Sequence, residues 1–532
     1  MNLQNSSTGE AQAATHTTEQ ETVVRIQSGP VRGIARDERG VVAYKGIPYA
    51  AAPIGELRWR SPQPVKAWSE VRECTQFGAR CLSAWEGDRE PGPPRSEDCL
   101  SLNIWTPTQK SDDRLPVMVW VHGGGFQFGS SASPSFDGSR LAQKGVVVVS
   151  FNYRVGVFGF MAHPELDREA PSGNYGLQDQ LAAFAWVKAN IAAFGGNPDN
   201  ITAFGESAGA HAIGILMASP LAVGLFDKAI GQSGALWDGS NGSLESFDEA
   251  HARGMAFAAK VGVTSISALR ELPAEQLNAA ALWNFNRNPM VSAFSPNVDG
   301  HLVPELPGKT YAQGRQMNIP LLAGWNDAEY FPFRGLGLPQ ESASAFRQAA
   351  QSWFGADRMD EFLELYPADT DAQAKASADA LAGDLIISEQ TWLWLQLQRR
   401  AGQAATYGYL FSHTSPYVPI ASHLVEIPFV FGTLTPQFIL GSTQPPSDAD
   451  RALSDTMMSY WVNFAAAGNP NGPGLPQWPD FEGDGPVQQL GETVGPVAND
   501  QQNARFRFIS SYRTDGVFPA RWRKERIAGG GH

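Results

Sequence analysis

The sequence has few cysteines, no long apolar run and an excess of acidic over basic residues. Three cysteines among 532 residues do not by their number imply a disulfide framework. No run approaches the roughly 18 uninterrupted apolar residues that a spanning helix needs, and the amino terminus lacks the basic segment and apolar core of a signal peptide. The net charge of −14 argues against binding to nucleic acid or to anionic membrane surfaces. We therefore expect no membrane span and no nucleic-acid partner.

The length of the chain and its 42% hydrophobic content are enough for a large buried core. Residues 1–22 are poor in large apolar side chains, which predicts a disordered tail. We expect a single folded domain over residues 23–520. Helical insertions are expected near residues 237–294 and 341–401, and a flexible tail over residues 521–532.

Short apolar runs alternate with helical segments along most of the chain. Residues 115–121 and 146–150 are continuously apolar, which is typical of strands covered by helices on both faces. Residues 174–194 carry apolar side chains at steps of three or four and predict an amphipathic helix. Further strands are expected at residues 229–232, 320–323 and 407–411. This alternation predicts an α/β fold with a large, mostly parallel central sheet.

Residues 200–219 are typical of a strand, a sharp turn and a helix in immediate succession. The turn carries the sequence Gly-Glu-Ser-Ala-Gly, with Ser207 at its centre. Glycines have no Cβ, so they let neighbouring backbone approach and present the Ser207 hydroxyl at the carboxyl end of the strand. The pattern predicts a nucleophile elbow. Such a short motif also occurs by chance, and its alternative is a glycine-rich helix start.

A serine nucleophile needs a base and an orienting carboxylate. In α/β-hydrolases the base comes late in the chain, which leaves His413, His423 and His532. His532 is the terminal residue after three glycines, and we expect it to be solvated. The spacing of the chain does not choose between His413 and His423 as the base. Asp327 and Glu329 closely follow a predicted strand, where open α/β sheets carry functional groups, and either could be the acid.

Three glycines follow His122 at the end of the strand predicted at residues 115–121. Their backbone N–H groups, joined by that of Ala208, can be aimed at one point and stabilise an oxyanion. The alternative, a nucleotide-binding loop, is weak because no helix begins there with the required glycine spacing.

Four blocks of the chain resemble the type B carboxylesterase family, which includes cholinesterases, bacterial para-nitrobenzyl esterases and fumonisin esterases. The blocks are YKGIPYA at 44–50, SEDCLSLNIW at 96–105, FGGNP at 194–198 and the elbow. The resemblance covers residues 23–508. It implies an α/β-hydrolase fold whose insertions cap the active-site edge. It also implies a serine carboxylesterase that works through an acyl-enzyme without metal or organic cofactor.

The resemblance also implies roles for individual residues. Ser207 would be the nucleophile, and Gly124, Gly125 and Ala208 would form the oxyanion hole. The block HxxEIPFVFG, which begins at His423, would make this residue the base.

The acid would be Glu329, because the family block GxNxDEG appears here as GWNDAEY at residues 324–330. Ala328 and Tyr330 replace the usual Asp and Gly in that block, which makes this match the poorest of those that the triad needs.

The spacing of the cysteines alone does not choose between a disulfide and three reduced thiols. The family pairs the positions of Cys81 and Cys99, which implies a disulfide here and leaves Cys74 free. A disulfide favours a periplasmic or secreted protein. The absence of a signal peptide in the sequence leaves a cytoplasmic location open.

Several aromatic residues follow the blocks that carry the chemistry. Each could belong to the core, but in the expected fold they converge on one edge of the sheet. We expect them to form an apolar wall that favours uncharged esters with short-to-medium acyl chains or aromatic groups. They are Phe126, Phe128, Trp237, Phe331 and Phe333.

The sequence leaves two alternative functions open. One is a catalytically silent binding or adhesion protein of the same fold, and the other is a hydrolase of amides or carbamates. The sequence names neither the small-molecule substrate nor the oligomeric state.

Overall fold

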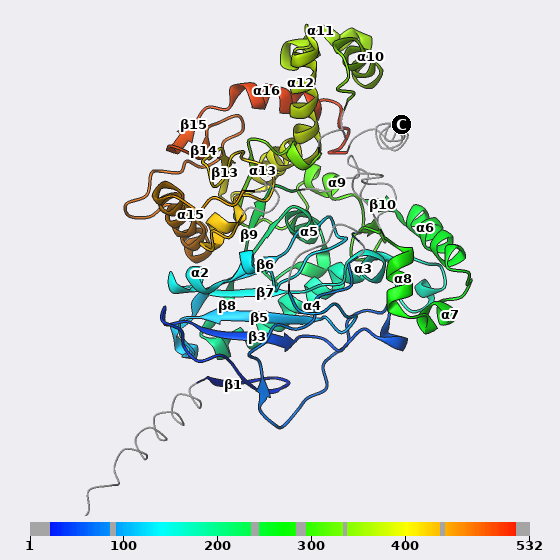
Figure 1. Cartoon of the computed structure of the whole chain (residues 1–532), viewed down its shortest axis with the longest axis vertical. Helices are drawn as coiled ribbons and strands as arrows, with labels where there is room; N and C mark the ends of the chain where they lie inside the picture. Colours follow the sequence, from blue (N-terminus) through cyan, green and yellow to red (C-terminus); the bar gives the residue numbers. More distant parts are fainter. Residues whose placement is uncertain are drawn as a thin grey trace, which may run out of the picture.

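A ten-stranded sheet forms the centre of the computed structural model, which describes residues 22–83, 85, 92–235, 244–282, 294–333, 338–436 and 442–517. In chain order its strands are β3 (Val42–Pro48), β5 (Ser101–Thr106), β6 (Leu115–Val121), β7 (Val147–Phe151), β8 (Gly196–Glu206), β9 (Lys228–Gln232), β12 (Leu321–Asn326), β13 (Thr406–Phe411), β14 (Val487–Leu490) and β15 (Val494–Val497). The order across the sheet is β15-β14-β13-β12-β9-β8-β6-β7-β5-β3 (Figure 1). Neighbours from β14 to β7 are parallel, whereas β14–β15, β5–β7 and β3–β5 are antiparallel. The large, mostly parallel sheet is confirmed.

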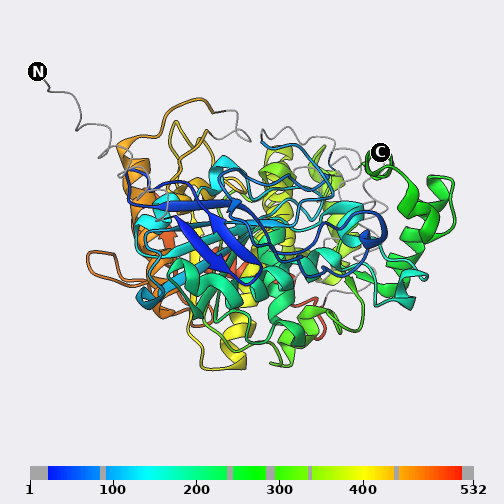
Figure 2. The same cartoon turned by 90° about the horizontal axis from the view of Figure 1, so that it is seen from below.

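The helices follow the alternation that the sequence predicts. They are α2 (Ser139–Gln143), α3 (Gly156–Phe160), α4 (Tyr175–Asn190), α5 (Ala208–Met217), α6 (Phe247–Lys260), α7 (Ile266–Glu271), α8 (Ala274–Ala280), α9 (Pro307–Ala312), α10 (Ala343–Phe354), α11 (Met359–Leu365), α12 (Asp371–Gly383), α13 (Glu389–Ala401), α14 (Ile427–Phe431), α15 (Asp448–Ala467) and α16 (Asp500–Ser510). A small sheet of β1 (Val23–Ile26), β2 (Gly29–Arg32) and β4 (Arg72–Glu73) lies outside the large one (Figure 2). A second small sheet pairs β10 (Glu245–Ser246) with β11 (Asn297–Val298).

The side chains of β6 alternate between two hydrophobic cores, although the strand is continuously apolar. Val117, Val119 and Val121 pack in the core that includes α4 and α5. Met118 and Trp120 pack in the core that includes α14 and α15. Successive side chains of a strand point to opposite faces, so each face of the sheet carries a helical layer. Helices on both faces are thereby confirmed.

The predicted helix at residues 174–194 is α4 followed by a 3-10 turn, Ile191–Phe194. Part of its polar side, however, is also buried. The Asp179 carboxylate is fully buried and accepts bonds from Arg154 Nε at 2.8 Å and Nη2 at 2.7 Å. This bidentate pair offsets part of the cost of burying both charges, which allows this side of the helix to pack inside the protein.

The segment 341–401 forms two different structures. Helices α10, α11 and α12 build a third core with α16 at the top of Figure 1. Helix α13 continues from α12 through a π-helical turn, Asp384–Ser388, and packs against β12 and β13. The last helix of the predicted insertion therefore belongs to the layer that covers the sheet.

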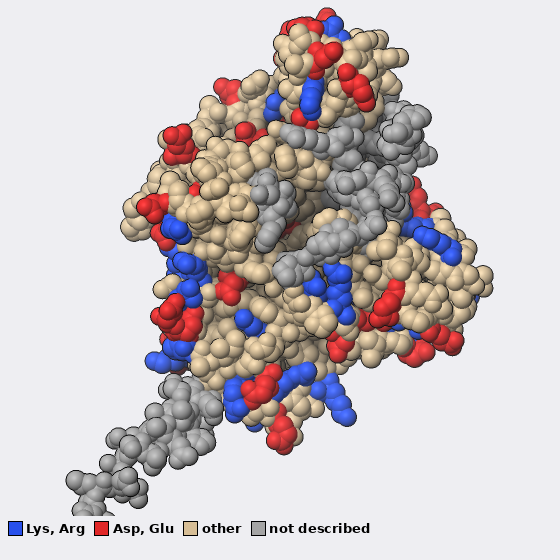
Figure 3. All heavy atoms as spheres, in the orientation of Figure 1, with Lys and Arg blue, Asp and Glu red and all other residues tan. Residues whose placement is uncertain are grey.

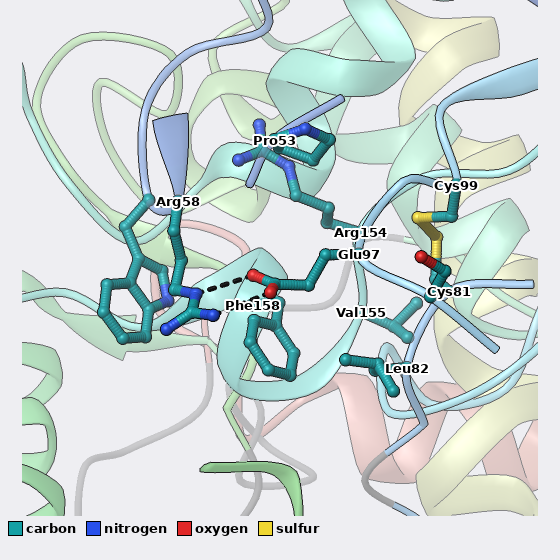
Figure 4. A pocket seen from close by; sticks show the side chains of 11 residues that line it. Pro53, Arg58, Cys81, Leu82, Glu97, Cys99, Arg154, Val155 and Phe158 are labelled. Carbon is teal, nitrogen blue, oxygen red and sulfur yellow. Dashed lines mark hydrogen bonds and ion pairs between the residues drawn. A yellow bond between two sulfur atoms is a disulfide. The ribbon is translucent and has the colours of Figure 1, made fainter. Parts of the chain in front are cut away.

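Cys81 and Cys99 form a disulfide with a Cα–Cα distance of 5.1 Å, as the resemblance implied. Beside it, Arg58 Nε and Nη2 donate to the two Glu97 carboxylate oxygens at 2.6 and 2.7 Å (Figure 4). Arg58 Nη1 also donates to three backbone carbonyls at the end of α7. Hydrogen bonds of Arg58 thus connect the disulfide region to the segment that carries α7. Cys74 is a buried free cysteine.

The surface carries charges of both signs. Acidic and basic side chains are interspersed among neutral ones on the face drawn in Figure 3. Among the helices that the structure describes, none is long and apolar enough to cross a membrane.

Candidate active site

Ser207 lies at the turn between β8 and α5, in a backbone conformation that is rare for a residue with a side chain. Its φ is 52° and its ψ is −123°. The turn is closely packed, because a Cβ on Gly209 would lie 2.0 Å from the carbonyl oxygen of Val121 and one on Gly205 would lie 2.7 Å from it. Only glycine fits these two positions, so the strand–turn–helix geometry depends on them.

His423 and Glu329 are hydrogen-bonded to each other in the interior. The imidazole Nδ1 lies 2.7 Å from Glu329 Oε2, and both side chains are buried. Glu329 Oε1 accepts a bond from the backbone N–H of Asn326 at 2.7 Å. Both carboxylate oxygens are therefore engaged, which fixes the orientation of the carboxylate and of the ring that it holds.

The other ring nitrogen of His423 reaches the elbow. Its Nε2 lies 3.1 Å from Oε1 of Glu206, the residue that immediately precedes Ser207. Within the described residues, no hydrogen bond joins Nε2 to the Ser207 hydroxyl. Catalytic hydrogen bonds are often long before substrate binds. The missing bond between His423 and Ser207 is therefore compatible with a serine–histidine pair.

Three buried glutamates lie at this site: Glu206 and Glu329 contact the His423 ring, and Glu426 contacts Asn326 and Gln232. Burial and the charges of Glu426 and Glu329 raise the pKa of Glu206 well above its ordinary range. This raised pKa favours the protonated, uncharged form of Glu206. Burial likewise raises the pKa of Glu426, although bonds from Asn326 and Gln232 oppose the rise.

Sequence reasoning missed the part that Glu206, Glu426 and Asn326 play at the site. Asn326 Nδ2 donates to Glu426 Oε2 at 2.7 Å, while its backbone N–H holds Glu329. The two glutamates stand inside blocks that the sequence singles out, next to Ser207 and three residues after His423. Their places within these two blocks were the signal that the sequence offered.

The residues that spacing left as alternatives for the base and the acid have different contacts. His413 Nε2 lies 2.7 Å from Oδ1 of Asp450, in the first turn of α15. Asp327 is exposed, and its backbone N–H donates to the Phe411 carbonyl. His413 and Asp327 thus have other contacts, whereas His423 and Glu329 meet beside the elbow.

The glycine loop after β6 runs directly past the elbow. A Cβ on Gly123 would lie 3.1 Å from Ser207 Cβ. Gly124 and Gly125 have φ values of 107° and 59°. In the described part of the chain, the backbone N–H groups of Gly124, Gly125 and Ala208 donate to no acceptor. These donors are free to bind an oxygen of a ligand.

The comparisons with known proteins agree with this geometry. The family model described as "Carboxylesterase family" matches residues 20–509. The chain belongs to the carboxylesterase family. A fumonisin B1 esterase from Sphingopyxis macrogoltabida is 40% identical over 502 residues, covering 91% of this chain and 88% of that protein. A para-nitrobenzyl esterase from Bacillus subtilis (strain 168) is 34% identical over 497 residues, covering 91% and 97%.

A solved structure titled PNB esterase has a TM-score of 0.79 and 33% identity, covering 94% of this chain and all of that chain, 100%. This similarity confirms the α/β-hydrolase fold. Carboxylesterase family membership, with esterases of this similarity, establishes that the protein is a carboxylic ester hydrolase.

The predicted pocket aromatics of this carboxylesterase have different surroundings. Phe333 packs beside His423 with ring centroids 5.1 Å apart, and Phe128 packs on Trp85 at 4.2 Å. Phe126 is fully buried against a neighbouring core phenylalanine. Phe331 begins the 3-10 turn Phe331–Phe333 and is half-buried. Trp237 lies outside the described residues.

Among the described residues of this carboxylesterase, no group of three or more His, Cys, Asp or Glu side chains is arranged to hold a metal ion.

Proposed function

We propose that this carboxylesterase hydrolyses its ester through a covalent acyl-enzyme, with Ser207 as nucleophile, His423 as base and Glu329 as the orienting acid. The observation that carries the proposal is the His423 imidazole, held at 2.7 Å by Glu329 while its other nitrogen reaches the residue before Ser207. The strained backbone at Ser207 supports it further, because a nucleophile elbow exposes the hydroxyl in this way.

In the first step, the Ser207 oxygen attacks the carbonyl carbon of the ester and its proton passes to His423 Nε2. The imidazolium then donates that proton to the leaving alcohol as the carbon–oxygen bond breaks. Water repeats the sequence in the second step, releases the carboxylic acid and restores Ser207. Glu329 keeps the proton of the ring on Nδ1, so that Nε2 is the nitrogen that accepts.

The proposed oxyanion hole consists of the N–H groups of Gly124, Gly125 and Ala208. Two observations support it. These N–H groups donate to no acceptor among the described residues, and the glycine loop after β6 runs beside Ser207. Fixed backbone donors stabilise the negative oxygen of the tetrahedral intermediate without having to reorient. Loss of one such donor costs about 3 kcal/mol in other serine hydrolases.

The substrates that we propose are uncharged esters with short-to-medium acyl chains or aromatic groups. Phe333 beside the base and Phe128 after the glycine loop support an apolar wall. Kinetics on a graded series of para-nitrophenyl esters tests this. Higher efficiency on emulsified long-chain triglycerides than on soluble aryl esters would contradict it.

Hydrolysis of para-nitrophenyl butyrate by the wild type and by Ser207→Ala tests the proposed mechanism. We expect turnover by the wild type and none above background by the variant. If neither protein hydrolyses any activated ester, the mechanism is wrong for this chain and the binding role gains support. Faster turnover of matched amides or carbamates than of esters would favour the other alternative.

A further inference from the structure

A groove of about 730 Å³ lies between α9, α13 and α16, and none of the proposed catalytic residues lines it. The three helices lie on the upper side of the molecule in Figure 1, and α13 contacts both of the others. Small-molecule sites in proteins have volumes of roughly 300–1,000 Å³. The groove is therefore large enough for a ligand of drug-like size.

The floor of the groove is apolar and comes from one face of α13. Trp392, Leu393 and Leu397 line it, each less than a tenth exposed. Leu393 and Leu397 are four residues apart and so stand one above the other on the helix. This face would bury the apolar body of a ligand.

The charges that line the groove are all positive. Arg400, Arg507 and Arg513 line it, and no described acidic residue does, although the chain carries a net charge of −14. Arg513 is paired with Glu389 at 2.6 Å, and Arg507 with Asp484 at 2.6 Å. Exposed Arg400 has no ion-pair partner among the residues that the structure describes.

We propose that this groove binds an amphipathic organic carboxylate, with its apolar body on α13 and its carboxylate at Arg400. An arginine fork matches the two oxygens of a carboxylate. The acid that ester hydrolysis releases has this chemistry, as does a free fatty acid. Because Ser207, Glu329 and His423 do not line the groove, the proposal does not depend on the mechanism proposed for Ser207.

Calorimetric titration of the full chain with sodium decanoate tests the proposal. Arg400→Glu should weaken binding by roughly tenfold or more, as expected for a lost charged hydrogen bond. Arg399→Glu is the matched control, because Arg399 is the next residue of the same helix, contacts Glu482 and does not line the groove. Its affinity should equal that of the wild type.

Decyltrimethylammonium, which has the same chain and the opposite charge, should not bind. Equal affinity for decanoate in Arg400→Glu and Arg399→Glu would overturn the proposal, since binding at the catalytic centre would behave in this way. Equal binding of the cationic analogue would also overturn it. So would sedimentation showing a dimer that Arg400→Glu dissociates, because the groove would then hold a second copy of the chain.

Discussion

Glu329→Gln should inactivate the enzyme while leaving its fold in place, for a reason that lies in the hydrogen bonds of the carboxylate. Oε1 accepts from the Asn326 backbone N–H, and Oε2 faces His423 Nδ1, each at 2.7 Å. A glutamine offers one acceptor oxygen and one NH₂ donor. If its oxygen stays on the Asn326 N–H, its NH₂ faces Nδ1.

Nδ1 must then act as an acceptor, and the neutral ring carries its proton on Nε2. A ring in this tautomer cannot take the proton of Ser207. In the reverse orientation the NH₂ meets the Asn326 N–H, and that donor loses its acceptor. Replacement of a triad carboxylate by its amide lowers kcat by about 10⁴, which corresponds to about 5.5 kcal/mol of activation free energy.

Steady-state hydrolysis of para-nitrophenyl butyrate measures this loss, with thermal unfolding as the check on folding. Asp327→Asn is the matched control, because it makes the same chemical change at an exposed position two residues away. We expect its kcat to be close to that of the wild type. Nearly full activity of Glu329→Gln, or severe loss in Asp327→Asn, would refute the assignment of the acid.

Three further predictions concern other buried groups. Because the pKa of Glu206 is raised on folding, the folded state keeps a proton that the unfolded state loses above pH 4.5. As the pH rises above 4.5, this group therefore lowers the stability of the folded state. The melting temperature of Glu206→Gln, minus that of the wild type, should therefore increase between about pH 5 and about pH 8, and a constant difference would contradict this. Replacing Cys81 and Cys99 with serine should cost about 3 kcal/mol in denaturant unfolding, given their separation of 18 residues; no change would show that the disulfide does not constrain the unfolded chain. Burial raises the pKa of Cys74 to about 11, so its thiol should resist iodoacetamide at neutral pH until the protein unfolds, and rapid labelling of the native protein would contradict this.

The sequence predicts best those parts that local chemistry determines. The elbow could be recognised because Gly205 and Gly209 lie against β6, where a side chain would clash with a backbone oxygen. The helix after it begins at Ala208 and ends at Met217, as its run of helix-forming residues indicates. The continuous apolar runs likewise became β6 and β7, because both faces of the sheet are covered.

Contacts between distant segments could not be predicted in the same way. Spacing along the chain did not choose between His413 and His423, and only the resemblance pointed to His423. In the fold His413 meets Asp450, while His423 meets Glu329. The edge strand β15 has the sequence VGPV, whose glycine and proline are unfavourable in a strand, so its pairing with β14 depends on tertiary contacts.

The central claim is that Ser207 is the residue that becomes acylated. Incubation with a fluorophosphonate probe, followed by peptide mass spectrometry, tests it most directly, because the probe bonds only to an activated serine. We predict one adduct per chain, on the peptide that contains Ser207, and no adduct in Ser207→Ala. Labelling of another serine, or equal labelling of the Ser207→Ala protein, would contradict the account.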